Sequence, residues 1–479
     1  MRNGRGNIKS TSIYIAIAGI FMLIICQSWL SDGMFMDGTI YAVISRNLAI
    51  GSGSFWQPHF SDTLFPVFME HPPLAFGLEG VFFMIFGDSR FVERFYSLLT
   101  IPITAIVLVS IWKQLQKNSS TGWLPVLFWI LMPTVSWASV NNMLENTLVI
   151  FLCLSVLFYL KSLKKNRIVF ICTAGLMLSL GFLTKGFVAF APLAFPFFIW
   201  FCLRNNKFLS MVSDTLLMLF SSLLPLVLLF FMPGSREYLP TYIEMAFSKI
   251  TEGVTASSRF YIIYRLLLEL LPSLGIIMVF MFFYWKNKLS YNNITSGLRP
   301  GAAFFSLGLA GVLPILLTMD QSAYFLLTSF PFFAVALGLL VNPFVENVLK
   351  RIDYNSRGYT FFKYFGILAL SVSIILSVYF SGVTNRDKNK LLDMRVIIGH
   401  LKENSTINIL PLMDNDWSLY SYYERYKKVS LDPDLKNRHE YLLITSSLYT
   451  DTINKGFERV DLKTEEYELF RRKIPDTRK

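Results

Sequence analysis

The stretch EHPPLAFGLEGVFFMIFG (residues 70–87) decides the topology of this largely apolar chain. If this stretch crosses a membrane, every later loop lies on one side; if it does not, every later loop lies on the other. An acid and an imidazole precede two prolines, and an apolar run of about fifteen residues follows. That run falls short of the roughly 20 residues that a spanning helix needs, and it suits a helix lying at the membrane surface or dipping into it. We therefore expect residues 72–87 not to cross the membrane.

The composition is that of a polytopic membrane protein. Of 479 residues, 53% are hydrophobic and only 16% are charged, and the mean hydropathy is +0.48, whereas an average soluble domain is about 25% charged. The formal net charge is +12, but lysine and arginine gather in short loops between apolar runs, which favours contact with anionic lipid headgroups and argues against nucleic-acid binding. The four cysteines lie inside apolar runs and indicate neither a disulfide framework nor a metal site.

Apolar runs of spanning length predict about eleven transmembrane helices. They lie near residues 13–30, 92–112, 122–140, 145–160, 168–184, 186–203, 210–232, 260–285, 302–318, 323–341 and 362–381. If residues 72–87 do not cross, every second loop between these runs is basic, as the positive-inside rule requires. The N-terminus is then cytoplasmic. The acidic residues that lie next to apolar runs, and so are not ordinary solvated surface residues, all fall on the exoplasmic side of the membrane.

Two parts of the chain differ in composition. Residues 1–381 are predicted to form an all-α transmembrane domain, whose first exoplasmic loop (31–91) carries interfacial helices. In residues 382–479 the charge density rises, and segments such as YLLITSSLY (441–449) are typical of strands. The fold class that follows is an all-α polytopic membrane protein with a small, soluble, exoplasmic α/β domain of roughly a hundred residues at its C-terminus.

Two acids stand at the starts of predicted helices. Asp37 opens MDGTIYAVISRNLAIGSGSFWQP (36–58), where apolar residues recur at the spacing of an amphipathic surface helix. Glu145 begins the span at 145–160. Each acid is either an N-cap that satisfies free backbone N–H groups or a carboxylate held where the headgroup of a lipid-linked substrate would sit. Local sequence leaves both interpretations open.

Lys185 is the most unusual charge, because it lies between two apolar runs in LGFLTKGFVAFAPL (180–193). Burying its ammonium group there costs about 2.5–3.5 kcal/mol unless the side chain snorkels or is paired. A phosphate or Glu145 would be a suitable partner. His59 and His71 share the first loop with Glu70, but no HxxH-type spacing supports a metal site, so hydrogen-bonding histidines are the better interpretation.

Five segments in combination resemble a known family. They are MDGTIYAVISRNLAIGSGSFWQP (36–58), MEHPPLAFGLEG (69–80) with the Arg-led helix after it, MLENTLVIFL (143–152), LGFLTKGFVAFAPL (180–193) and QSAYFLLTSFPFFAVALG (321–338). Over roughly residues 10–345 they are similar to the polyprenyl-phosphate-sugar-dependent glycosyltransferases of the GT-C fold, glycosyltransferase family 39. That group includes protein O-mannosyltransferases and lipid A aminoarabinose transferases.

The resemblance implies roles for individual residues. Asp37 would be the catalytic carboxylate, Glu70 a second acid of the site, and Glu145 the acid beside the sugar or phosphate. The substrate-binding positions that it implies are Tyr41, His59, His71, Lys185, Arg259 and Tyr324. The chain departs from the family pattern where Gly38 replaces an acid, His71 a lysine and Glu145 an aspartate.

A divalent metal ion stays open as a cofactor, and no other cofactor is expected. The family uses such an ion, but residues 233–259 offer no obvious counterpart of the family's later histidine. Arg236, Lys249 and Arg259 in that segment could serve the phosphate instead. The metal ligands are therefore left unassigned.

The implied function is transfer of a sugar from a polyprenyl-phosphate donor to an exoplasmic lipid, glycan or protein, with inversion. Asp37 would take the proton of the acceptor hydroxyl, and general-base help of this kind is typically worth ~10²–10⁴-fold. The expected partners are the lipid-linked donor, the acceptor and the bilayer, with no nucleic acid. By family analogy the chain belongs in a bacterial inner membrane, with its active site and C-terminal domain in the periplasm.

The main alternative is a transporter or flippase of lipid-linked or small polar substrates. Such proteins place ionisable residues in mid-span, often in broken helices of repeated halves. Here the acids lie at span ends on one face, and no internal repeat is evident. A lipid-glycan polymerase or ligase would be expected to carry a large arginine-rich exoplasmic loop, and a non-catalytic scaffold has no reason to gather acids at one face.

Overall fold

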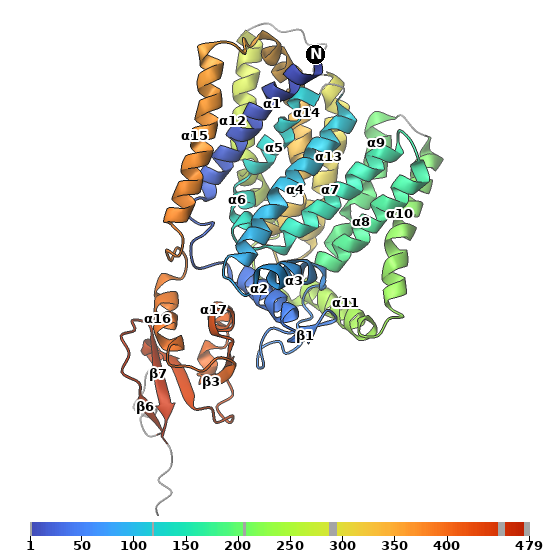
Figure 1. Cartoon of the computed structure of the whole chain (residues 1–479). Helices are drawn as coiled ribbons and strands as arrows, with labels where there is room; N and C mark the ends of the chain where they lie inside the picture. Colours follow the sequence, from blue (N-terminus) through green and yellow to red (C-terminus); the bar gives the residue numbers. More distant parts are fainter. Residues whose placement is uncertain (1, 117–118, 205–206, 287–294, 449–455, 474–479) are drawn as a thin grey trace, which may run out of the picture. The chain divides into compact units, whose positions relative to one another are not determined.

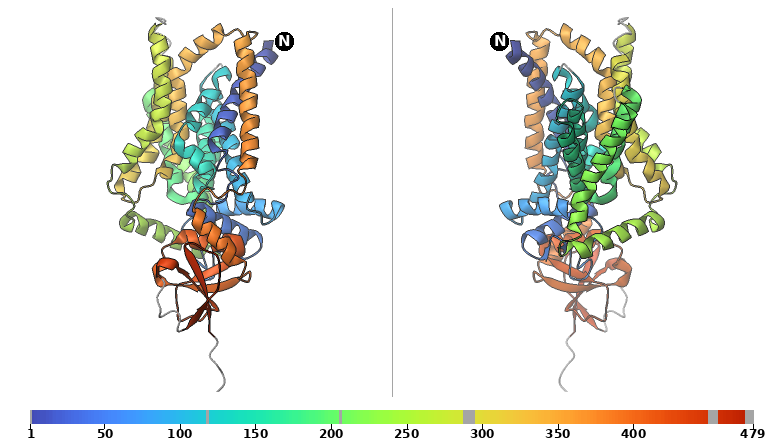
Figure 2. Two further views of the ribbon diagram at one scale, coloured as in Figure 1. Left: turned by 90° about the vertical axis from the view of Figure 1, so that its left-hand side faces the viewer. Right: turned by 90° about the vertical axis from the view of Figure 1, so that its right-hand side faces the viewer.

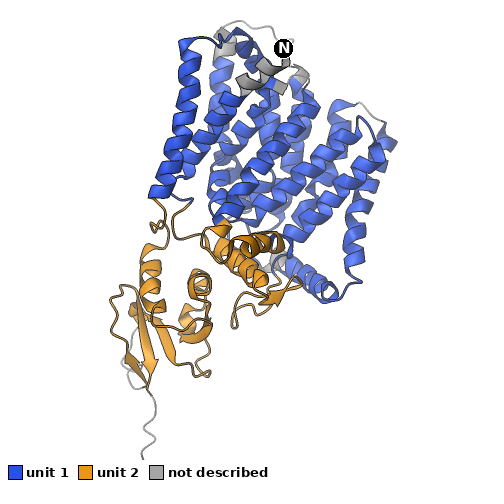
Figure 3. Cartoon of the chain, viewed as in Figure 1, with its two compact units in different colours: residues 1–29, 70–75, 94–379 blue, residues 30–69, 76–93, 380–479 orange. Residues whose placement is uncertain are grey.

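The structure, a computed structural model, describes residues 2–116, 119–204, 207–286, 295–448 and 456–473. Its contacts divide the chain into two compact units (Figure 3). The first unit comprises Met1–Trp29, Glu70–Ala75 and Arg94–Tyr379, and the second comprises Leu30–Met69, Phe76–Glu93 and Phe380–Lys479.

The first unit is a bundle of long helices that run alongside one another (Figures 1 and 2). Its α-helices are α1 (Arg2–Ile25), α4 (Val92–Leu115), α5 (Trp123–Ile130), α6 (Pro133–Ser139), α7 (Leu144–Ser162), α8 (Arg167–Lys185), α9 (Phe195–Leu203), α10 (Phe208–Leu229), α11 (Ser235–Glu252), α12 (Tyr261–Lys286), α13 (Thr295–Val312), α14 (Phe330–Arg351) and α15 (Arg357–Tyr379). Short 3-10 helices connect them: η1 (Ser119–Thr121), η2 (Gly186–Ala194), η4 (Leu313–Leu317) and η5 (Ala323–Thr328).

Eight helical segments of the described chain are long and apolar enough to cross a membrane. The other three of the eleven predicted spans differ in detail. The N-terminal span has a shorter apolar part, Thr11–Ile25. Residues 186–203 form η2 and α9, which belong with α8 to one long apolar segment, Arg167–Leu203. Residues 122–140 form two short helices. Residues 72–87 contain α3 (Leu74–Phe86), whose 13 residues fall short of spanning length, as predicted.

The predicted span at 122–140 breaks where α5 ends and Pro133 begins α6. Proline is well suited to the first turn of a helix because its missing N–H needs no partner there. The backbone N–H of Thr134 donates to Oε2 of Glu269 at 2.9 Å, and the Thr134 hydroxyl donates to Oε1 at 2.6 Å. A buried carboxylate on α12 therefore satisfies the start of α6 and stabilises the break.

Helices α1 and α15 pack closely because glycines lie at their contact. A Cβ on Gly366 would lie 3.1 Å from Cα of Ala16, and a Cβ on Gly19 would lie 3.0 Å from the carbonyl oxygen of Gly366. Glycines at such positions let two membrane helices approach until their backbones touch. By contrast, a Cβ on Gly275 in α12 would meet nothing within 4 Å.

Gly366→Ala is expected to lower the apparent melting temperature of the purified protein, because the added methyl forces α1 and α15 apart at a cost of about 1–3 kcal/mol. Gly275→Ala is the matched control, and it should leave the melting temperature unchanged or raise it, since alanine favours helix by up to about 1 kcal/mol. Equal shifts in the two variants would show that the α1–α15 approach does not limit stability.

The second unit combines the first loop with the C-terminal segment. The first loop contributes α2 (Met36–Ala49), α3 and the strands β1 (Gly53–Ser54) and β2 (Gln57–Pro58). The C-terminal segment contributes α16 (Lys388–Ile398), α17 (Trp417–Lys427), the 3-10 helices η6 (Pro411–Met413) and η7 (Ser446–Leu448), and five strands: β3 (Ser405–Ile409), β4 (Val429–Asp432), β5 (Tyr441–Thr445), β6 (Phe457–Arg459) and β7 (Tyr467–Arg472). The predicted α/β character of the C-terminus is confirmed.

The five strands form one mixed sheet in the order β4-β3-β5-β7-β6. Strand β3 pairs in parallel with β4 and β5, whereas β7 pairs antiparallel with β5 and β6. Leu442, Ile444 and Phe470 form a buried apolar cluster on it. The predicted division at residue 381 follows closely on the end of the first unit at Tyr379, but by contacts the first loop groups with the C-terminal segment rather than with the helices. The division into independently folding domains stays a prediction.

Candidate functional site

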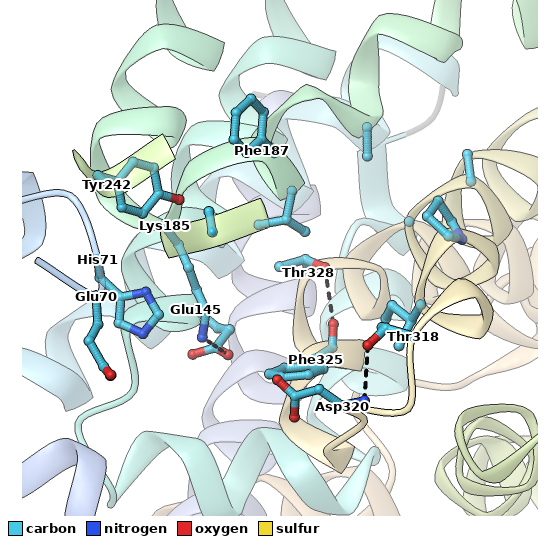
Figure 4. Close-up of a pocket in the computed structure, with 17 residues that line it drawn as sticks. Glu70, His71, Glu145, Lys185, Phe187, Tyr242, Thr318, Asp320, Phe325 and Thr328 are labelled. Atoms are coloured by element: carbon cyan, nitrogen blue, oxygen red, sulfur yellow. Dashed lines mark hydrogen bonds and ion pairs between the residues drawn. The ribbon is translucent and has the colours of Figure 1, made fainter. Parts of the chain in front are cut away.

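A cavity of about 430 Å³ lies in the first unit and gathers ionisable residues from distant parts of the chain (Figure 4). Its polar lining comes from the segment before α3, the start of α7, the end of α8, α11 and the turn after η4. The residues that line it are Glu70, His71, Glu145, Lys185, Phe187, Val188, Ala191, Tyr242, Ala246, Ala310, Gly311, Pro314, Ile315, Thr318, Asp320, Phe325 and Thr328. Four of the predicted site residues, Glu70, His71, Glu145 and Lys185, are thus brought together.

The centre of the cavity wall is an ion pair between Lys185 and Glu145 (Figure 4). The side chains are 11% and 1% exposed, so the pair is buried. Glu145 lies in the first turn of α7, where Met143 is the capping residue and makes no side-chain cap bond. Pairing with Glu145, one of the two predicted partners of Lys185, is therefore confirmed, and the snorkelling alternative is excluded. The N-cap interpretation of Glu145 is replaced by an ion pair.

The surroundings of this pair leave one carboxylate oxygen of Glu145 without a partner among the described residues, whereas Lys185 has aromatic neighbours. Oε1 of Glu145 contacts Lys185, but Oε2 is buried without a hydrogen-bond partner among the described residues. Nζ of Lys185 lies 5.4 Å from the ring centroid of Tyr324 and 5.7 Å from that of Phe325, which is within cation–π distance. An unsatisfied buried oxygen costs about 1–3 kcal/mol, which a hydroxyl of a bound substrate would recover.

Close packing around Gly186 shapes one side of the cavity. Gly186 ends α8 with φ of +80°, and a Cβ there would lie 1.6 Å from the hydroxyl oxygen of Tyr242. The position therefore admits only glycine, and this explains the Lys-Gly pair of the sequence. Tyr238, on the same helix as Tyr242, donates its hydroxyl to the backbone oxygen of His71 at 2.6 Å and so holds the segment that carries Glu70 and His71.

The opposite side of the cavity is the turn around Asp320 (Figure 4). Oδ1 of Asp320 accepts a hydrogen bond from the Thr255 hydroxyl at 3.0 Å. The buried Gln321 donates to the backbone oxygen of Arg259 at 2.9 Å, which fixes the chain there. The Arg259 side chain is exposed and does not line the cavity, so its predicted phosphate contact stays a prediction. Tyr324 stacks on Trp137, with ring centroids 6.0 Å apart.

Most of the other lining residues escaped the sequence analysis, and Tyr242 and Thr328 are two polar examples. Residues 233–259 were expected as a loop, but they contain α11, and the spacing of its buried Tyr238, Leu239 and Tyr242 was the available signal. Thr328 lies at the end of η5, and nothing in its local sequence marks it.

The other predicted site residues lie in the second unit. Asp37 is in the first turn of α2, where Phe35 is the cap and makes no side-chain cap bond. The N-cap interpretation of Asp37 is therefore wrong, although a first-turn carboxylate still interacts favourably with the helix dipole. Tyr41 is buried, with its ring 5.7 Å from that of Phe76. Nδ1 of His59 lies 3.0 Å from the carbonyl oxygen of Pro66, which confirms a hydrogen-bonding histidine.

The donor set does not fit a metal centre among the described residues. No group of three or more histidine, cysteine or acidic side chains is arranged to hold an ion in the described parts of the chain. Glu70 and His71 line the cavity, but they are adjacent in the chain, and Glu145 is paired with Lys185. No step of a reaction at this site is therefore assigned to a metal ion.

A buried acid with a raised pKa lies beside α2. Burial raises the pKa of Glu424 from 4.5 to about 7, although its carboxylate accepts a hydrogen bond from Ser430 at 2.6 Å and feels the charge of Arg46. The folded state thus holds the proton more tightly than the unfolded state does. The contribution to stability is then fully present below about pH 4.5 and is lost as the pH rises through about 7, where the buried group is half ionised.

Glu424→Gln is expected to flatten this dependence, because glutamine has no proton to lose. The measurement is the apparent melting temperature of the purified protein between pH 5 and 8. Glu403→Gln, which changes an exposed acid paired with Lys428, is the control and should leave the wild-type slope in place. An identical slope in wild type and Glu424→Gln would contradict the assignment.

The chain is similar to known proteins in sequence. Residues 70–233 match the family described as dolichyl-phosphate-mannose-protein mannosyltransferase. The chain is 28% identical over 159 residues to undecaprenyl phosphate-alpha-4-amino-4-deoxy-L-arabinose arabinosyl transferase 2 of Proteus mirabilis (strain HI4320), covering 32% of this chain and 28% of that protein. It is 26% identical over 195 residues to the corresponding transferase of Pectobacterium carotovorum subsp. carotovorum (strain PC1), covering 40% of this chain and 34% of that protein. The match spans about a third of the length of these relatives.

The similarity in structure extends over nearly the whole chain. The crystal structure of ArnT from Cupriavidus metallidurans bound to undecaprenyl phosphate has a TM-score of 0.62, with 12% sequence identity over 96% of this chain and 97% of that one. The apo structure of the same protein also has a TM-score of 0.62, with 13% identity over 95% of this chain and 97% of that one. The predicted GT-C type of fold is confirmed.

Proposed function

We propose that this chain is a membrane glycosyltransferase that moves a sugar from a polyprenyl-phosphate donor to a lipid, glycan or protein acceptor. The observation that carries the proposal is the buried Lys185–Glu145 pair in the wall of the cavity. The rest of that wall includes the apolar Phe187, Val188 and Ile315, as a lipid-linked substrate requires. The relatives bear the name of undecaprenyl-phosphate-sugar transferases, and the ArnT structure holds undecaprenyl phosphate, which supports the same donor class.

Each polar group has a task in this reaction. Asp37, identified by its motif, takes the proton of the acceptor hydroxyl as its oxygen attacks the anomeric carbon. The bond between that carbon and the phosphate oxygen breaks, and the lipid phosphate leaves with inversion at the sugar. Lys185 stabilises the negative charge that develops on the phosphate. Glu145 holds Lys185 through Oε1, and its Oε2 can accept a hydrogen bond from a sugar hydroxyl.

The placement in the membrane follows the charge pattern. We propose a cytoplasmic N-terminus, with the Asp37 loop and the C-terminal sheet on the exoplasmic side, because every second loop is then basic. The named relatives are bacterial, which supports an inner-membrane location.

The test uses the purified chain in proteoliposomes, with a panel of polyprenyl-phosphate sugars labelled in the sugar and membranes from the native host as acceptor. One donor should be converted to polyprenyl phosphate, while its label appears in a host lipid, glycan or protein. Label that stays on the lipid and only changes leaflet would overturn the proposal in favour of a flippase.

A further inference from the structure

The C-terminal segment holds the helix that carries Asp37, and all of the contacts involved lie within the second unit. Helix α17 packs against α2. The chain just before α2 pairs with residues 383–385, where the N–H of Asp32 donates to Val383 at 2.9 Å and the N–H of Asn385 donates to the Asp32 carbonyl at 3.1 Å. The Asp32 carboxylate also pairs with Arg395 of α16.

Tyr422 of α17 contacts the chain three residues before Asp37. Its hydroxyl accepts the N–H of Met34 at 3.3 Å. The single phenolic proton lies within donating distance of the Met34 carbonyl oxygen, at 2.9 Å, and of Oδ2 of Asp387, at 2.7 Å. Burial raises the pKa of Tyr422, so the phenol keeps this proton. Both backbone groups of Met34, three positions before Asp37, thus lie within hydrogen-bond distance of one hydroxyl.

The far end of α2 is held by the same helix. Arg46, in the last turn of α2, is buried and donates from one guanidinium nitrogen to the carbonyl oxygens of Glu424 and Arg425, at 2.8 and 3.3 Å. These carbonyls belong to the last turn of α17, where free acceptors and the helix dipole favour a cation.

Arg425 of α17 also binds the segment where α3 ends and α4 begins. Its guanidinium makes two hydrogen bonds to the carboxylate of Glu93, at 3.1 and 3.0 Å, and a third to Asp88 at 2.7 Å. The Arg425 side chain is 6% exposed. Bidentate arginine–carboxylate pairs fix geometry as well as adding energy.

We infer that the C-terminal segment is the positioning element of the reaction, and that Tyr422 is a positioning residue that sets the place of the Asp37 carboxylate through the backbone of Met34. This rests on the proposed function, in which Asp37 is the general base. A general base must lie within hydrogen-bond reach of the proton that it removes. A misplacement of about 1 Å can cost on the order of 10²-fold in rate.

The test compares Tyr422→Phe with Tyr420→Phe in the full-length, membrane-reconstituted chain. Tyr420 is the matched control because it lies on the same helix and is equally buried, but its hydroxyl donates to Asp414 at 2.7 Å, within the C-terminal segment. Tyr422→Phe should lower kcat for sugar transfer by about 10- to 100-fold with little change in the donor KM. It should also speed amide hydrogen exchange in residues 34–40, and Tyr420→Phe should do neither.

Equal losses of kcat in the two variants, or unchanged exchange at residues 34–40 in Tyr422→Phe, would overturn the inference and leave the C-terminal segment with a role in stability alone. If the wild type consumes no donor, the proposed function fails, and the exchange comparison alone then decides whether Tyr422 holds the start of α2.

Discussion

Lys185→Met is expected to destabilise the first unit by roughly 3–5 kcal/mol, because it removes the cation that pairs with the buried carboxylate of Glu145. Glu145 is 1% exposed, and its Oε2 already lacks a hydrogen-bond partner among the described residues. Without Lys185 the carboxylate must either remain as an uncompensated buried charge or take up a proton. The measurement is the apparent melting temperature of the purified variant in detergent.

The double variant Glu145→Gln/Lys185→Met is the control for this effect. Removing both charges leaves a neutral pair of similar volume, and such replacements are often neutral or stabilising. The double variant should therefore recover most of the stability that Lys185→Met loses. If the two variants melt at the same temperature, the loss comes from altered packing and not from the charge of Glu145.

Asp37→Asn is expected to lower kcat by ~10²–10⁴-fold with little change in the donor KM, because the amide cannot take the acceptor proton. The two side chains have the same shape, so α2 should keep its place. The measurement is steady-state sugar transfer at equal protein concentration. Asp62→Asn is the control, since Asp62 is an exposed acid of the same loop.

If Asp37→Asn transfers sugar as fast as wild type, Asp37 is only a charge in the first turn of α2. In that case its loss would cost the helix about 0.3–1 kcal/mol of dipole interaction and nothing in catalysis. A small fall in the melting temperature with unchanged kcat would be the signature of that role.

The sequence alone predicted those features of the fold and of the site that depend on a local pattern of residues. The apolar runs predicted most of the long helices, and the short run at 72–87 was correctly separated from them. Lys185 stood out because an ammonium between two apolar runs requires a partner, and Glu145 was one of the two partners that this argument offered. Motif resemblance also predicted the fold, which the ArnT structure confirms.

Local sequence did not predict features that depend on contacts between residues far apart in the chain. The break at Pro133 depends on Glu269, which lies on α12 and caps α6. No local sequence pattern predicts the contact between Glu269 and the start of α6. Likewise, the expectation that Asp37 or Glu145 acts as an N-cap assumed that the acid directly precedes the helix, whereas the capping residues lie two positions before each acid.

The assembly of the second unit is the least predictable feature. The hydrogen bonds between Tyr422 and Met34 join residues that are 388 positions apart. In the sequence, residues 382–479 carry only the signs of an ordinary soluble domain. Their attachment to the Asp37 loop arises from the buried guanidinium groups of Arg46 and Arg425, which need acceptors that only the folded chain supplies.

The measurement that tests the central claim most directly is sugar transfer by the Glu145→Gln/Lys185→Met variant, compared with wild type on whichever donor the wild type consumes. This variant should remain folded, but it lacks the Lys185 ammonium group that would stabilise the departing lipid phosphate. Removing one preorganised stabilising group typically costs ~10²–10³-fold in kcat, so transfer should fall at least that far while the melting temperature stays near that of wild type. Transfer at the wild-type rate by the folded variant would show that the cavity holding this ion pair is not where the donor reacts.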